Sequence, residues 1–172
     1  ADTAATPAAP AAPAAPPTEG PGSTYIAKTF DDWSLQCMRT EDGKDPCQLY
    51  QLLKDDKGNN VADISMLPLP AGGPAVTGVT LMTPLETLLT QNLTLKIDTS
   101  EAKVYPFTFC AQVGCFARVG LTQGELDAFK KGNKATATIV PLAAPNTKVE
   151  VTISLKGFTA AYEEMAKGYA DK

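Results

Sequence analysis

The chain has 172 residues, carries a net charge of −4 and is 44% hydrophobic, which suits one globular domain with a sizeable core. Its acidic balance and scattered lysines offer no positive field, so nucleic acid and anionic lipid are poor partners. The chain has four cysteines and no histidine. Because imidazole is the commonest general base and metal ligand, its absence excludes most zinc, Ser-His and Cys-His sites, and we expect neither a metal nor a cofactor.

The N-terminal segment over residues 1–24 is dominated by alanine and proline, including the run AATPAAPAAPAAPP. Such sequences bury little and favour extended polyproline conformations. We expect a disordered tether, which is either a spacer or an ordinary mobile tail, followed by a single β-rich domain over residues 25–172. The chain begins at Ala1-Asp2, as it would after removal of a signal peptide. No apolar run approaches the ~18 residues that span a bilayer, so we expect an exported protein without a transmembrane segment.

The segments after the tether alternate short apolar stretches with turn residues, a pattern typical of antiparallel β domains. Residues 148–156 show it best, because apolar and polar side chains alternate with a period of two that a helix would disrupt. Residues 33–37 and 47–53 alternate in the same way and flank the turn sequence EDGKDP, which predicts a hairpin. Further strands are predicted over residues 61–67, 76–82, 93–97, 104–109, 115–119 and 135–140.

Two helices are predicted among these strands. The sequence LTQGELDAFKKGN contains Thr122 and Glu125 at the spacing of a capping box. The sequence FTAAYEEMAKGYA, for which we expect Thr159 as the N-cap, places Tyr162, Met165 and Tyr169 along one stripe. Many short strands with two short helices predict a mainly β fold, either an antiparallel sandwich or a partly open barrel.

The even number of cysteines is typical of two disulfides, which persist in oxidising compartments. Four cysteines allow three pairings. We favour Cys37 with Cys47 and Cys110 with Cys115, because each pair flanks a predicted hairpin loop. Neither spacing is Cys-x-x-Cys, which argues for a structural role over a redox-catalytic one.

Candidate catalytic groups are sparse. The serines lie in no recognisable nucleophile elbow or Ser-x-x-Lys motif. Paired carboxylates occur at residues 31–32, 55–56 and 163–164, at predicted element ends or on a solvated helix, so a carboxylate enzyme is the third alternative. The stretch DDKGNN lacks the alternating carboxylates of a calcium loop. We therefore expect a protein that is not an enzyme.

Two segments are candidates for contact with a partner. The aromatic residues at 105, 107 and 109 share one strand face and are expected in the core. Phe116 and Arg118 lie on the strand face opposite Cys115 and form a candidate contact patch, although core packing is the favoured alternative for Phe116. The loop LPLPAGGPAVTG is apolar and stiffened by proline. The candidate contact residues are Phe116, Arg118, Pro68 and Pro70.

Four sequence stretches together resemble the invasion-associated locus B family: WSLQC at 33–37, PCQLYQ at 46–51, FCAQVGCFARVGLT at 109–122 and SLKGFTAAY at 154–162. The resemblance spans residues 33 to about 165 and leaves the tether outside. It implies an exported protein of Gram-negative alphaproteobacteria with a periplasmic or outer-membrane-associated location, and in Bartonella a virulence factor implicated in erythrocyte entry. It implies no reaction and no site residues.

The leading hypothesis is an exported, non-enzymatic envelope protein that acts through protein contacts and, in pathogens, supports host-cell invasion. We expect its partner to be an envelope or host-cell surface protein, with peripheral outer-membrane association and no role for nucleic acid. The alternative is a periplasmic module that binds a glycan, lipid or peptide. Its groove would be lined by Tyr105, Phe107, Phe116 or Tyr50.

Overall fold

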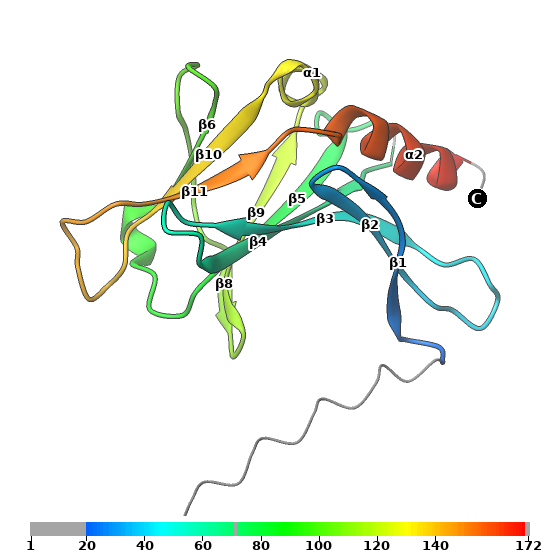
Figure 1. The fold of residues 1–172 in the computed structure, drawn as a ribbon, viewed down its shortest axis with the longest axis horizontal. Coiled ribbons are helices and arrows are strands. Elements are labelled where there is room, and N and C mark those ends of the chain that lie inside the picture. The colour runs from blue at the N-terminus through cyan, green and yellow to red at the C-terminus, as the bar shows by residue number, and fades with distance from the viewer. Residues whose placement is uncertain (1–19, 71, 171–172) are drawn as a thin grey trace, which may run out of the picture.

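The computed structural model describes residues 20–70 and 72–170 (Figure 1), so residues 1–19 of the predicted tether lie outside the described residues. The described chain is mainly β, with eleven strands in one antiparallel sheet. The strands are β1 (Thr24–Phe30), β2 (Trp33–Met38), β3 (Cys47–Lys54), β4 (Asn60–Pro68), β5 (Thr77–Thr83), β6 (Leu93–Ile97), β7 (Lys103–Tyr105), β8 (Phe109–Ala111), β9 (Gly114–Leu121), β10 (Lys134–Ile139) and β11 (Val149–Ser154). The helical elements are η1 (Leu89–Gln91), α1 (Gln123–Lys131) and α2 (Phe158–Ala170).

The sheet curls into a half-barrel. Its main path runs β7-β6-β10-β11-β3-β4-β5-β9-β8, and β1 and β2 branch from β3. The two ends of this path, β7 and β8, are joined by residues 106–108 alone. Three residues span little more than ~10 Å, so the two edges must approach each other. Of the two predicted architectures, the partly open barrel is the one observed, and the two helices and both predicted disulfides are confirmed.

The core lies on the inward side of the curled sheet, under the two helices. Trp33 is fully buried, and its ring lies 5.3 Å from that of Phe158 at the start of α2. Phe158 also packs on Phe129 of α1 at 5.9 Å and on Tyr162 at 5.8 Å. Both helices therefore attach to the sheet through one aromatic cluster, and they leave the outward side of the sheet uncovered.

A buried glutamine closes a seam in the sheet. β2 pairs with the first half of β3, whereas β11 pairs with β3 at Lys54 and Thr152. Between these two pairings the side chain of Gln51, which is 6% exposed, accepts from the Ser154 backbone N–H at 2.8 Å and donates to the Ser154 carbonyl at 3.0 Å. The indole N–H of Trp33 donates to the same carbonyl at 2.8 Å. Two side chains thus make the hydrogen bonds that a neighbouring strand would make.

The helix starts agree in part with the sequence. The capping box is confirmed, because the Thr122 hydroxyl accepts from the Glu125 backbone N–H and the Glu125 carboxylate accepts from that of Thr122. The expected N-cap at Thr159 is wrong, because α2 already begins at Phe158. The Thr159 hydroxyl instead donates to the Lys130 carbonyl at the end of α1. The turn before α2 needs Gly157, whose φ is 81° and where a Cβ would lie 2.3 Å from the Phe30 carbonyl oxygen.

The predicted single strand over residues 104–109 is wrong. Pro106 has no N–H to donate and interrupts it, so the chain forms β7 and β8, which pair with β6 and β9 at opposite ends of the sheet. As a consequence Phe109, expected in the core, is 41% exposed. The edge strand β1 and the short helix η1 were not predicted.

Candidate functional site

The outward face of β8, β9, β5 and β4 carries a row of large side chains. Pairing registers place Phe109 opposite Phe116, Phe116 opposite Met82, and Met82 opposite Asp63. Leu52 of β3, which is 46% exposed, continues the row. Because alternate strand residues point to opposite sides, all five side chains lie on the side away from the helices.

An aromatic and arginine stack lies at one end of this row. The rings of Phe109 and Phe116 are nearly parallel, with centroids 4.8 Å apart. The Arg118 guanidinium lies 5.2 Å from the Phe109 ring centroid, a cation–π contact. The Cys110–Cys115 disulfide joins directly opposite positions of the same hairpin. It therefore holds Phe109 against Phe116.

The proline loop folds onto the same outward face. A Cβ at Gly78 would meet the Leu69 side chain at 3.3 Å, and one at Gly120 would meet the Ala75 Cβ at 2.9 Å. The paired glycines therefore make room for the loop after β4, which contains Pro70. Leu67, 39% exposed, points outward beside Gly78.

Two of the four candidate contact residues, Phe116 and Arg118, lie on the outward side of β9, and the loop that contains Pro70 packs on the neighbouring outward positions through Leu69 and Ala75. Pro68 does not belong to this surface, because it is the last residue of β4 and pairs with the buried Thr77 on the inward side of the sheet. We call Phe109, Phe116, Arg118 and the loop with Pro70 the aromatic–proline face. The sequence does contain one sign of the loop packing, namely Gly78 and Gly120 within two strands. Glycine within a strand often marks a place where another chain segment approaches closely.

The charged groups lie at opposite ends of the row that runs from Phe109 to Asp63. Arg118 lies at the aromatic end and makes no ion pair, because the single ion pair among residues 20–70 and 72–170 joins Lys103 to Glu125. Asp63 lies at the other end, where the Tyr50 hydroxyl donates to its carboxylate at 3.4 Å. Burial raises the pKa of Asp63, against the opposing effect of the Tyr50 hydrogen bond. A partner would therefore meet a cation and a partly buried carboxyl group with apolar side chains between them.

A small pocket of about 250 Å³ lies between β6, β7 and α1, and Leu95, Ile97 and Phe129 contribute its apolar lining. The Tyr105 hydroxyl at its rim donates to Glu125 at 3.1 Å. Burial and the adjacent carboxylate raise the pKa of Tyr105 to about 12.

The sequence predicted a groove lined by Tyr105, Phe107, Phe116 or Tyr50. The structure places these residues at three different sites. Tyr105 lines the pocket beside α1. Phe107 packs, partly buried, against the core. Phe116 and Tyr50 lie on the outward face of the sheet. Of these four residues, a groove for the ligand-binding alternative would therefore be built around Tyr105.

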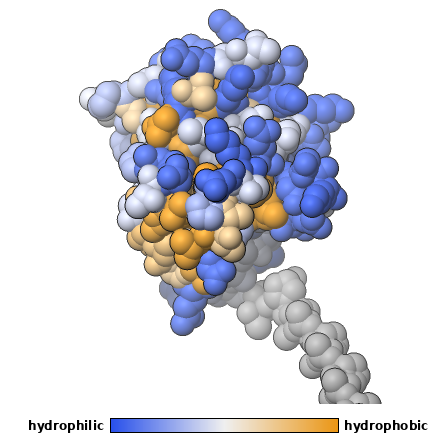
Figure 2. All heavy atoms as spheres, turned by 90° about the vertical axis from the view of Figure 1, so that its left-hand side faces the viewer, coloured by the Kyte–Doolittle hydropathy of each residue, from blue (hydrophilic) through white to orange (hydrophobic). Residues whose placement is uncertain are grey.

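A second exposed apolar surface comes from two loops. The segments around residues 84–89 and 141–143 are joined by a bridge between Thr87 and Pro141. They carry Leu85, Leu89 and Leu142, which are 49%, 40% and 56% exposed. Figure 2 views this end of the molecule and shows hydrophobic residues gathered on its lower part. The sequence did not reveal this surface because its residues come from two distant loops.

The carboxylates do not form a metal site, and the helices do not include a membrane span, among the described residues. Within the described ranges, no three His, Cys, Asp or Glu residues are grouped so that they could hold a metal ion. The pair at residues 31–32 lies in a turn, where Asp32 accepts from the Ser154 hydroxyl. In the same part of the chain, no helix is long and apolar enough to cross a membrane.

Comparison with known proteins identifies similar chains. The model of the family described as "Invasion associated locus B (IalB) protein" matches residues 33–166. Invasion protein B homologs of Brucella abortus strains 2308 and 9-941 are each 30% identical over 144 residues, which cover 84% of this chain and 81% of theirs. The crystal structure of invasion associated protein B from Bartonella henselae has a TM-score of 0.69 and 19% identity, and the match covers 84% of this chain and 97% of that chain. The half-barrel is therefore shared with that protein.

Proposed function

Because the chain belongs to the invasion-associated locus B family, we propose that it is an exported envelope protein that binds another protein and catalyses no reaction. The aromatic–proline face is the observation that carries this proposal. It gathers the exposed Phe109, the half-buried Phe116, an arginine and a proline-stiffened loop where no helix covers the sheet. Aromatic and arginine side chains contribute most to protein interfaces.

The proposed place of action is the periplasm or the outer surface of a Gram-negative bacterium. Two disulfides support this location, because such bonds persist in oxidising compartments. The names of the Brucella and Bartonella relatives support a role in host-cell invasion, and erythrocyte entry is the form that we propose for pathogens. The partner is an envelope or host-cell surface protein.

The partner should present apolar side chains beside an acidic group. The apolar side chains would cover Phe109 and Phe116, and the acidic group would pair with Arg118, which contacts an aromatic ring and no carboxylate among the described residues. Cation and carboxylate in a desolvated interface attract each other strongly. Reversing the charge of Arg118 should therefore weaken binding more than removing it.

Site-specific crosslinking in the native bacterium tests the proposal. A photoreactive side chain at position 109 should capture a defined protein, and the same group at Lys167, exposed on α2, should not. Arg118→Glu should abolish the adduct, whereas Lys44→Glu, in the exposed turn after β2, should leave it unchanged. The same adduct from both positions, or none from position 109, would refute this use of the face.

Location and invasion need separate measurements. Protease added to intact cells should cleave a surface-exposed protein and spare a periplasmic one. Deletion of the gene should reduce entry into erythrocytes in an invading host, and unchanged entry would count against the invasion role alone.

A further inference from the structure

A row of lysines and threonines crosses the outward face of the other half of the sheet. Lys96 of β6 lies opposite Thr136 of β10, Thr136 opposite Thr152 of β11, and Thr152 opposite Lys54 of β3. Two ammonium groups therefore flank two hydroxyl groups along one line across four strands. Neighbouring strands are ~4.8 Å apart, so the row extends over roughly 15 Å.

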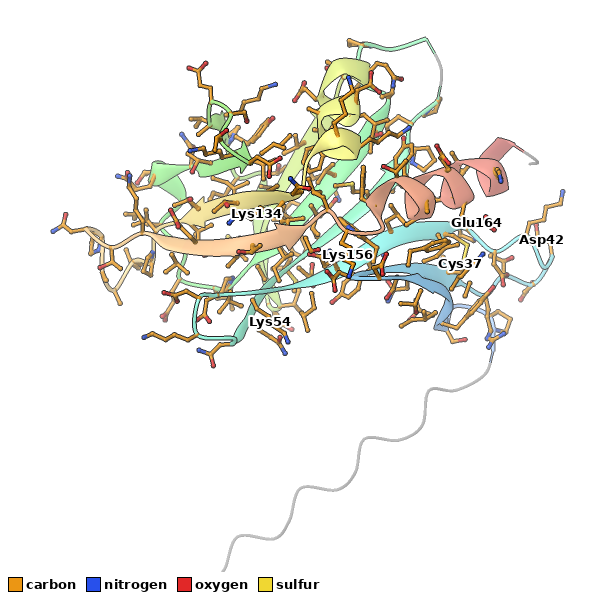
Figure 3. All side chains as sticks on the ribbon, turned by 45° about the horizontal axis from the view of Figure 1, so that its top comes forward. Cys37, Asp42, Lys54, Lys134, Lys156 and Glu164 are labelled. Carbon is orange, nitrogen blue, oxygen red and sulfur yellow. A yellow bond between two sulfur atoms is a disulfide. The ribbon has the colours of Figure 1, made fainter. Side chains whose placement is uncertain are left out.

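More lysines gather on this face than the sequence suggested. Lys134 and Lys148 belong to it through the alternation of β10 and β11, and Lys156 lies two positions after the last residue of β11. Figure 3 shows Lys54, Lys134 and Lys156 over neighbouring strands. The expectation of scattered lysines is wrong here, because strand pairing brings together residues that are far apart in the chain. We call Lys54, Lys96, Lys134, Lys148 and Lys156, with the threonines between them, the lysine–threonine face.

These five lysines are exposed, and none joins the Lys103–Glu125 ion pair, the single one among the described residues. Several carboxylates lie among these lysines. Asp98 accepts from the backbone N–H groups of residues 133 and 134, and Asp32 accepts from the Ser154 hydroxyl. Glu150 shares the face, and Asp55 and Asp56 directly follow Lys54. Over β6, β10 and β11 three lysines lie with two carboxylates, Asp98 and Glu150, so this part of the face is net positive in a chain whose net charge is −4.

The surface is hollowed where these residues meet. A depression of about 540 Å³ lies here. Its lining includes three lysines and two carboxylates, together with amide and hydroxyl residues: Lys96, Lys134, Lys148, Asp98, Glu150, Gln91, Asn92, Thr94, Thr136 and Thr138. Hydroxyl and amide groups can exchange hydrogen bonds with sugar hydroxyls, and ammonium groups pair with sulfate or phosphate. We propose that the lysine–threonine face binds an anionic saccharide.

The lining argues against other anions. It contains no aromatic residue, so nothing stacks on the bases of a single-stranded nucleic acid. One exposed apolar residue, Val104 of β7, lies opposite Thr94 at the edge of this face, and a single aliphatic side chain is much less than the broad apolar face that inserts into a lipid surface. A sulfated glycan of a host surface and a phosphorylated saccharide of the bacterial envelope share the required chemistry.

Calorimetric titration of the purified protein tests the assignment with four probes: a sulfated heparin octasaccharide, its desulfated form, a phosphorylated lipopolysaccharide core oligosaccharide and a DNA duplex. We expect binding of the sulfated or the phosphorylated saccharide, weakened by salt, and no binding of the desulfated one. The charged saccharide that binds identifies the source. Failure of both, or DNA binding of equal strength, would overturn the proposal.

Matched lysine variants locate the site. The double variant Lys96→Gln/Lys134→Gln should bind the charged saccharide about tenfold more weakly, because it removes two of the exposed charges that pair with the sulfate or phosphate groups. The control Lys44→Gln/Lys167→Gln removes the same charge from exposed positions elsewhere and should change affinity less than about twofold. Thermal unfolding confirms that each variant folds. Equal losses in the two variants would overturn the assignment to this face.

Discussion

Replacing Gln51 tests whether a side chain holds the seam between β2 and β11. In Gln51→Met the volume is kept, but the Ser154 backbone N–H loses its acceptor at 2.8 Å. The Ser154 carbonyl keeps its bond from Trp33. The expected cost is therefore that of one unsatisfied donor in a largely buried site.

The magnitude follows from that single group. An unsatisfied buried donor costs about 1–3 kcal/mol, so we expect a loss of about 2 kcal/mol in the free energy of unfolding. For a domain of this size the corresponding fall in Tm is about 4–8 °C. Gln48→Met is the matched control, because Gln48 lies on the same strand and its side chain donates to Gln36 on the outward face. Its effect should stay within about 0.5 kcal/mol.

Urea unfolding followed by tryptophan fluorescence measures both variants. Trp33 is the single tryptophan of the chain, and its indole reports directly on the seam. Hydrogen exchange adds a local readout, since the Ser154 amide should lose protection in Gln51→Met and keep it in Gln48→Met. Equal midpoints for the two variants, or an unchanged Ser154 amide, would refute the role of Gln51.

The disulfides and the partly buried Tyr105 give two more predictions. Replacing Cys37 and Cys47 by serine should lower the free energy of unfolding by about 3 kcal/mol, and replacing Cys110 and Cys115 by about 2 kcal/mol. The first loss is larger because the loop-closure entropy grows with the number of residues between the cysteines, 10 against 5. Denaturant midpoints in the reverse order would contradict this. The pKa of Tyr105 is raised from 10.0 to about 12, so its stabilising effect is complete below pH 10 and is lost as the pH rises through 12. Tyr105→Phe should remove the latest component of the tyrosinate absorbance titration, and an identical curve in the variant would argue against a partly buried hydroxyl beside Glu125.

Local features of the sequence predicted most individual elements. The alternation over residues 148–156 corresponds to β11, and the capping box at Thr122 sets the start of α1. These features depend on neighbouring residues only. β1 escaped prediction because five of its seven residues are exposed and the other two are half-buried, so no buried face imposes an alternation. The break at Pro106 was readable, and the strand assignment gave too little weight to its missing N–H.

The candidate surfaces could not be predicted because they depend on register. Phe109 contacts Phe116 because the two residues pair within one short hairpin. Lys54 and Lys96 lie in one row only because four strands pair in a particular order. Residues 42 positions apart carry no local sign of their proximity. Alternation predicts which side of a strand a residue occupies, and only the strand order predicts its neighbours on that side.

Strand order also separates the two proposed binding surfaces. The aromatic–proline face uses β4, β5, β8 and β9, and the lysine–threonine face uses β6, β10, β11 and the end of β3. Because the sheet curls, its outward side points in different directions at these two places, so a protein partner and an anionic saccharide can bind at once. Sites without shared residues or partners contribute additively. Arg118→Glu should therefore leave saccharide affinity unchanged, and Lys96→Gln/Lys134→Gln should leave the protein adduct unchanged, whereas coupling between them would mean that one ligand covers both faces.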